Sequence, residues 1–84
     1  PAGVASSDQA YDAYDRGKYL EARELAEKQA AKGVAASNTL LGILYERGLG
    51  MPIDAAQAAV HYANGAQLGD QHAQFALGGA IFQP

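Results

Sequence analysis

Two histidines are the residues of this chain best suited to metal or acid–base chemistry. His61 and His72 are too far apart for the i, i+4 pair that binds a metal ion from one helix face, and no cluster of carboxylates or cysteines joins them. We therefore expect no metal site and no cofactor. The simplest interpretation is that His61 is a half-buried packing residue with one nitrogen hydrogen-bonded, and that His72 is exposed at the start of a helix.

Other patterns also fall short of a catalytic or ligand-binding motif. Residues 48–50 (Gly-Leu-Gly) begin like a dinucleotide fingerprint, but Ile53 stands at the third glycine position and the pattern follows a helix rather than a strand. Asp8, Asp12 and Asp15 lack the spacing of a calcium loop. No serine or threonine has a histidine–acid pair nearby in sequence, and a small helical protein offers no obvious cleft for a triad. The sequence therefore predicts a protein that is not an enzyme.

Residues 37–70 are the segment around which the chain is organised, and they predict two helices separated by a turn. Apolar residues recur there at the i, i+3, i+4, i+7 spacing of a helix with one buried face. That face comprises Ser37, Leu40, Leu41, Leu44, Tyr45 and Gly48. Gly48 ends the pattern, and Gly50 and Pro52 prevent a regular helix in the residues that follow.

The second helix of this segment begins with a capping box. Asp54 is expected to accept a hydrogen bond from the backbone of Gln57, and the Gln57 side chain to reach back to Asp54. The buried face of this helix is expected to contain Ala58, His61, Tyr62, Gly65 and Ala66. The helix should stop at Gly69, and Asp70 should cap another helix.

The same pattern recurs when the sequence is shifted by 36 residues. The shift carries six residues of the first helix (Ser37, Leu40, Leu41, Gly42, Leu44 and Tyr45) onto Ala73, Ala76, Leu77, Gly78, Ala80 and Ile81. The reverse shift carries six residues of the second helix segment (Ala58, His61, Tyr62, Gly65, Ala66 and Gly69) onto Ala22, Leu25, Ala26, Gln29, Ala30 and Gly33. One such unit does not bury its own apolar face, whereas stacked units do. We therefore predict an all-α fold, an α-solenoid of antiparallel helix pairs with about five helices.

At these positions the sequence resembles the Sel-1-like repeat, a relative of the tetratricopeptide repeat. The matching and packing positions are Leu41, Gly42, Leu44, Tyr45, Gly48, Gly50, Asp54, Ala58, Tyr62, Ala66, Gly69, Asp70, Ala73, Gln74, Leu77 and Gly78. The match covers one full unit and the first helix of a second. His61 departs from the tryptophan usual in the family, and Gly65 from the usual alanine. The resemblance implies a right-handed stack of antiparallel helices and an adaptor role in signalling or complex assembly.

The expected organisation is one helical repeat domain at 7–84 behind a loose N-terminal tail at 1–6. Within the domain, 7–33 form a degenerate first pair, 37–70 the full unit, and 71–84 the first helix of an incomplete unit. Ser6 and Gln9 predict a capped helix from Ser7 to Arg16, followed by a helix from Tyr19 to Lys32. The glutamates of the second helix are interpreted as a solvated outer face, and a last helix is expected over 71–82.

Composition argues against one class of partner, nucleic acid, but leaves the cellular compartment open between two choices. The net charge is -3 and the pI is about 5.1, with no stripe of Lys and Arg to neutralise phosphates, so we expect no nucleic-acid partner. No apolar run is long enough to span a bilayer. There is no cysteine. An alanine-rich, cysteine-free chain suits a bacterial periplasm, with the cytoplasm as the alternative, and the start at Pro1 suggests a processed or excised piece.

A partner-binding groove is expected on the concave face of the stack. Aligning the first helices of the pairs places eight residues off the buried face: Asp8, Asp12, Asp15, Thr39, Ile43, Glu46, Arg47 and Phe75. The groove would be acidic at its N-terminal end and apolar at its C-terminal end, which suits a peptide or helix with a basic half and a hydrophobic half. The alternative is that the aspartates solvate a first helix and that the phenylalanines pack on a missing element.

The leading functional hypothesis is a non-enzymatic protein–protein interaction module of an adaptor or regulator. It would bind a segment of another protein on the concave face, or a second copy of itself through Phe75, Ile81 and Phe82 at its C-terminal end. Two alternatives stay open. The first is a hydrolase, because relatives in the family have been linked to β-lactam binding or hydrolysis, and the second is an inert solenoid spacer.

Overall fold

The computed structural model describes residues 6–78 as five α-helices, with no strand in this part of the chain. The helices are α1 (Asp8–Asp15), α2 (Tyr19–Ala31), α3 (Ala35–Arg47), α4 (Ala55–Gln67) and α5 (Gln71–Ala76). The all-α prediction is therefore confirmed, and α1 to α4 occupy the segments expected. The solenoid arrangement and the repeat pairs stay predictions.

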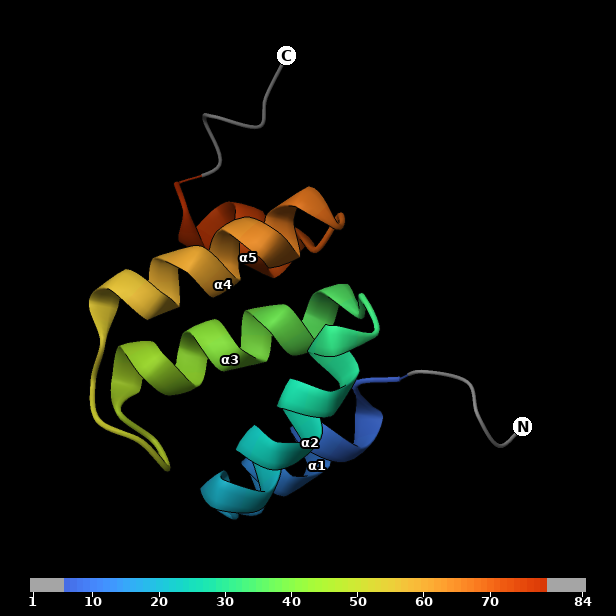
Figure 1. Ribbon diagram of the computed structural model, residues 1–84, viewed down its shortest axis with the longest axis vertical. Helices are drawn as coiled ribbons and strands as arrows, with labels where there is room; N and C mark the ends of the chain where they lie inside the picture. The colour runs from blue at the N-terminus through green and yellow to red at the C-terminus, as the bar shows by residue number, and fades with distance from the viewer. Residues whose placement is uncertain (1–5, 79–84) are drawn as a thin grey trace.

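Helix α3 is the centre of the molecule, because it contacts all four of the other helices. Figure 1 shows α3 and α4 running side by side in opposite directions, joined by the loop over 48–54. Helices next to one another in the sequence also pack together, from α1 on α2 through to α4 on α5. The buried residues of α3 include Ser37, Leu40, Leu41 and Leu44, which belong to its predicted apolar face.

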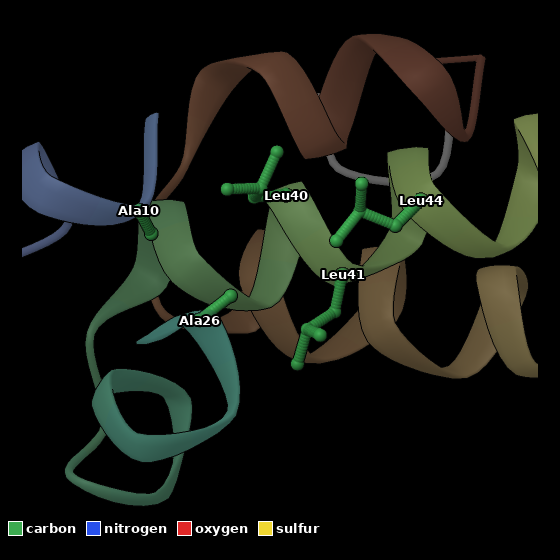
Figure 2. Packing of buried hydrophobic residues seen from close by; sticks show 5 residues of the cluster. All are labelled: Ala10, Ala26, Leu40, Leu41 and Leu44. Carbon is green, nitrogen blue, oxygen red and sulfur yellow. The ribbon is translucent and has the colours of Figure 1, made fainter. Parts of the chain in front are cut away.

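Two apolar clusters make up the core of residues 6–78, and side chains of α3 contact both of them. In the first, Leu40, Leu41 and Leu44 of α3 meet Ala10 of α1 and Ala26 of α2, as Figure 2 shows. The second cluster joins α4 to α5 and consists of Ala58, Tyr62, Ala66 and Ala73. Alanine contributes much of this buried surface, and it brings helix backbones close together at little transfer energy per residue.

The starts of α4 and α5 follow the predicted capping, with one correction. Asp54 Oδ1 accepts from the Gln57 backbone N–H (3.0 Å), and Asp70 Oδ2 accepts from the Ala73 N–H (3.0 Å). The reciprocal half of the box is wrong, because the Asp54 N–H donates to the carbonyl of Tyr45 (3.0 Å) rather than to Gln57. That bond fixes the start of α4 to the end of α3.

The capping box expected at Ser6 and Gln9 also differs from the structure. Ser6 Oγ accepts from the Asp8 N–H (3.1 Å), and α1 begins one position later than expected, at Asp8. The N-cap position itself is Ser7, whose side chain makes no capping hydrogen bond. Most of the expected N-terminal tail lies outside the described residues.

The end of α5 is the largest correction to the predicted elements. The sequence predicts a helix over 71–82, but α5 ends at Ala76, and Gly78 has a φ of +92°. A left-handed glycine stops a helix as Gly48 does after α3 (φ +69°), because a side chain would be strained there. Ile81 and Phe82 lie outside the described residues.

Glycine at two positions allows backbone and side chains to approach closely. A Cβ at Gly42 of α3 would lie 2.7 Å from Cδ1 of Tyr62, so the Tyr62 ring packs directly on the α3 backbone. A Cβ at Gly50 would lie 3.0 Å from the backbone carbon of Tyr19, which places the α3–α4 loop against the start of α2. The packing role expected for Gly42 and Gly50 therefore agrees with the structure. A Cβ at Gly78 would meet no atom of residues 6–78 within 4 Å, so the packing role expected for Gly78 stays a prediction.

Candidate protein interface

A groove of about 660 Å³ lies between α1 and α2, and carboxylates dominate its walls. Its lining residues are Asp8, Gln9, Asp12, Glu21, Glu24, Leu25 and Lys28. All of them are exposed except Leu25, which is half-buried and packs against the first core cluster. The groove therefore has an acidic rim and one apolar side chain that connects it to the core.

The charges of the groove are only weakly neutralised by the chain itself. Four carboxylates face one ammonium group, that of Lys28. Asp12 pairs with Arg16 of the following turn (Oδ2–Nε 3.2 Å), but the two side chains are 63% and 65% exposed. An ion pair this exposed contributes little free energy, so Asp12 remains available to a cationic partner.

The structure brings together only part of the predicted concave-face set. Asp8 and Asp12 line the groove, whereas Asp15 is exposed on the same helix and does not line it. Phe75 is on α5, is 85% exposed and does not line this groove. The acidic and apolar ends expected of one groove are therefore separate features of the described structure.

Thr39 contradicts the expectation that it lies off the buried face. It is 1% exposed, and its hydroxyl donates to Asp70 Oδ2 (2.7 Å) and is 3.3 Å from the Ala35 carbonyl oxygen. The cause lies in α4, where a Cβ at Gly65 would be 2.5 Å from Thr39 Oγ1. The missing side chain at Gly65 thus makes room for Thr39, and Asp70 satisfies its hydroxyl.

The other three predicted residues of α3 have intramolecular contacts. Ile43 is half-buried and packs against the second core cluster. Glu46 is exposed and accepts a hydrogen bond from the Tyr62 hydroxyl (2.8 Å), which ties the end of α3 to α4. Arg47 is exposed and donates from Nη1 to the Tyr14 hydroxyl (2.9 Å) of α1.

Three groove residues, Glu21, Glu24 and Lys28, were missed by the sequence analysis, which interpreted the charges of α2 as a solvated face. Their spacing of three and four places them on one face of α2. A second signal was the short connection at 16–18, which folds α2 back against α1 and so sets that face beside Asp8 and Asp12. The spacing of these charges, taken together with the short connection between α1 and α2, would have located the groove.

His61 is half-buried, as expected, but its surroundings differ from the prediction. Its ring stacks on Tyr45 of α3, with ring centroids 5.5 Å apart and an interplanar angle of 7°. Nδ1 is enclosed and has no hydrogen-bond partner among the described residues, so the expected hydrogen bond is not found on that nitrogen. Burial lowers the pKa of His61 from its ordinary value of 6.5, and the charge of Glu27 opposes this shift.

Two tyrosine hydroxyls hold neighbouring helices together in their neutral form. Tyr11 donates to the Ala36 carbonyl (3.1 Å), and burial, with the charge of Asp70 second, raises its pKa to about 12. Burial and the hydrogen bond to Glu46 also raise the pKa of Tyr62. Both groups therefore stay protonated and keep donating at neutral pH.

Comparisons with known proteins add no family assignment. No protein-family model, curated protein or solved structure matches this chain. Within residues 6–78, no group of three or more His, Asp or Glu residues is placed to hold a metal ion. In the same residues, no helix has both the length and the apolar character needed to cross a membrane.

Proposed function

We propose that this chain is a non-enzymatic protein-interaction module that binds a cationic segment of a partner protein in the α1–α2 groove. The observation that carries the proposal is the groove itself, with Asp8, Asp12, Glu21 and Glu24 around an opening of about 660 Å³. Sel-1-like helix pairs are the architecture we propose for it, on the strength of the recurring residue pattern.

Charge and shape indicate which segment would fit. Lys or Arg side chains would face the four carboxylates, and an apolar side chain would reach Leu25 at the side of the groove. Rim charges of this kind mainly set the association rate and its salt dependence. We therefore expect binding that weakens as the ionic strength rises, because the exposed carboxylates are screened over roughly 8–10 Å at physiological salt.

The test is the affinity of a fluorescein-labelled peptide of alternating lysine and leucine, measured by fluorescence anisotropy. The groove variant carries Asp12→Lys and Glu24→Lys. The control carries Asp15→Lys and Glu27→Lys, which make the same change in charge on the same two helices outside the groove lining. We expect the groove variant to lose about tenfold in affinity, or about 1.4 kcal/mol, and the control much less. Equal losses of affinity in the two variants would mean that peptide binding depends on net charge alone, and the groove proposal would be wrong.

Self-association is a second candidate, and Phe75 is the observation that favours it. Its side chain is 85% exposed on α5, and the 36-residue step aligns it with Thr39, which is 1% exposed under α4. Asp70 is the only Lys, Arg, Asp or Glu residue after Asp54, so two copies meeting at α5 would bring little charge together. Depletion of charge and an exposed aromatic side chain are typical of the core of an interface.

Sedimentation equilibrium over a range of concentrations tests this candidate. We expect the wild-type chain to form a dimer as the concentration rises, and Phe75→Gln to shift that equilibrium toward monomer without loss of helicity. A wild-type chain that stays monomeric, or a variant that dimerises as strongly, would contradict self-association through Phe75.

A further inference from the structure

Asn64 and Gly65 form the only Asn-Gly pair of the sequence, and the pair lies near the end of α4. An asparagine followed by glycine loses its side-chain amide more readily than other asparagines, because glycine has no Cβ to hinder attack by its backbone nitrogen. The other asparagine of the chain, Asn38, is followed by the β-branched Thr39 and is 6% exposed, whereas Asn64 is exposed. Asn64 is therefore the asparagine of this chain best suited to react.

Packing explains why glycine follows Asn64. Gly65 is buried, and a Cβ at residue 65 would lie 2.5 Å from Thr39 Oγ1 and 3.2 Å from the Cβ of Ala73. A side chain there would displace Thr39, whose hydroxyl donates to Asp70 Oδ2 (2.7 Å). The contact of α3, α4 and α5 therefore requires a glycine at this position, and the exposed asparagine before it makes the pair reactive.

The reaction of such a pair is an intramolecular attack that needs only water. The Gly65 nitrogen loses its proton and bonds to Cγ of Asn64, while the bond from Cγ to Nδ2 breaks and ammonia leaves with the proton. Water then opens the five-membered succinimide at either carbonyl, which leaves aspartate or isoaspartate at residue 64. Both products add a negative charge to α4, and isoaspartate also adds a backbone carbon that interrupts the helix.

Helix α4 opposes this reaction while it is closed. Ring closure requires Asn64 to leave the helical backbone angles, because inside a helix the next backbone N–H is turned toward the carbonyl one turn back. The Leu68 N–H donates to the Asn64 carbonyl (3.1 Å), and the Asp70 N–H donates to the Gly65 carbonyl (2.9 Å). Figure 1 shows α4 turning here through a short connection into α5, so these bonds hold the junction of the two helices closed.

We propose that Asn64 is a site of spontaneous deamidation and that opening of the last turn of α4 sets its rate. Asn64 lies in that last turn, since α4 ends at Gln67. Helix ends open locally at a lower free energy than the whole domain unfolds. The neighbouring helix α5, which packs on α4, has only six residues. The modification converts a reversible opening of this junction into a permanent change in charge and helicity.

The test follows the full 84-residue chain by mass spectrometry during incubation at mildly alkaline pH, where hydroxide promotes loss of the Gly65 proton. Trypsin places Asn64 in the peptide 48–84 and Asn38 in the peptide 33–47, so Asn38 is an internal control. We expect deamidation of Asn64 alone, with isoaspartate identified by electron-transfer fragmentation, and its absence from the Asn64→Gln variant. In guanidinium chloride the reaction should be at least about tenfold faster, which corresponds to an opening free energy of at least about 1.4 kcal/mol.

Two capping variants locate the opening. Asp70→Ala removes the carboxylate that joins Thr39 to the start of α5, and should speed deamidation of the folded chain about tenfold. Asp54→Ala removes the cap at the other end of α4 and should speed it less than about twofold.

Three results would overturn the proposal. The first is an Asp54→Ala chain accelerated by as much as its loss of unfolding free energy implies, because this result would place the reaction in the fully unfolded chain. The second is a folded chain that deamidates as fast as the denatured one. The third is an Asn64 that stays intact in the folded chain over many half-times of the reaction in the denatured chain.

Discussion

At the scale of single residues, the contact between Gly42 and Tyr62 decides how closely α3 and α4 approach. A side chain at residue 42 would meet the ring within 2.7 Å of Cδ1, and the ring is fixed by the hydrogen bond from its hydroxyl to Glu46. The ring is itself 7% exposed and belongs to the second core cluster. Added volume at this point therefore forces the two helices apart.

Gly42→Leu is expected to lower the free energy of unfolding by about 1–3 kcal/mol through overpacking, although leucine is the better helix former by about 1 kcal/mol. Urea denaturation followed by circular dichroism measures this change. Ala59→Leu places the same side chain at an exposed position of α4 and should change stability by less than about 0.5 kcal/mol. A Gly42→Leu variant as stable as the wild type would contradict the observed packing of Tyr62.

The free energy of unfolding should depend on pH through His61. Burial lowers its pKa below 6.5 in the folded state, so the unfolded state binds more protons as the pH falls through 6.5. The His61 contribution to stability is therefore present above that pH and is lost below it. We expect His61→Phe, which keeps an aromatic ring beside Tyr45, to flatten the fall in unfolding free energy between about pH 7 and pH 5.5.

The control for this measurement is His72→Gln, which removes an exposed histidine at the start of α5. That variant should keep the slope of the wild type. If His61→Phe leaves the slope unchanged as well, the enclosed environment of the imidazole does not contribute to the stability of the folded chain.

At the scale of the elements, Asp54 and Asp70 both cap a helix, but Asp70 accepts one more hydrogen bond than Asp54. Each accepts from the backbone N–H three residues on, but Asp70 Oδ2 also accepts from the Thr39 hydroxyl and so ties α3 to α5. Asp54→Ala should cost about 1 kcal/mol as a lost N-cap. Asp70→Ala should cost about 1 kcal/mol more, because a buried hydroxyl loses its shorter partner. Equal losses in thermal or urea denaturation would show that the Thr39 bond contributes nothing.

The elements were largely predictable from the sequence, because their signals are local. Asp54, Asp70 and Gly48 mark the helix ends at the positions where the structure has them. The end of α5 was not predictable from periodicity, since apolar residues continue past Gly78 while its backbone turns left-handed. Alignment of the helices likewise placed Thr39 on the surface, because the space that buries it belongs to a glycine on another helix.

The candidate site was predictable only in part, for a related reason. Alignment of the helices assigned Asp8 and Asp12 to an acidic concave surface, and the groove they line in the structure lies between α1 and α2. The other wall comes from α2, and nothing in the local pattern of Glu21 and Glu24 separates a groove from a solvated face. Only the packing of one helix against the next creates the concave space between them.

At the scale of the whole molecule, the chain divides its surface by charge. Every Lys, Arg, Asp and Glu except Asp70 lies at or before Asp54. The Asp70 carboxylate accepts intramolecular hydrogen bonds from the Thr39 hydroxyl and the Ala73 N–H. The acidic groove follows this division, because both of its walls, α1 and α2, belong to the charge-rich part of the chain.

Backbone amide shifts of the ¹⁵N-labelled chain would locate the bound lysine–leucine peptide and so decide whether the groove between α1 and α2 is the binding site. We expect saturable shifts concentrated along Asp8 to Asp12 of α1 and Glu21 to Lys28 of α2, and these shifts should weaken as salt is added. Shifts concentrated on α4 and α5, or no saturable shifts at low salt, would contradict binding in the groove between α1 and α2.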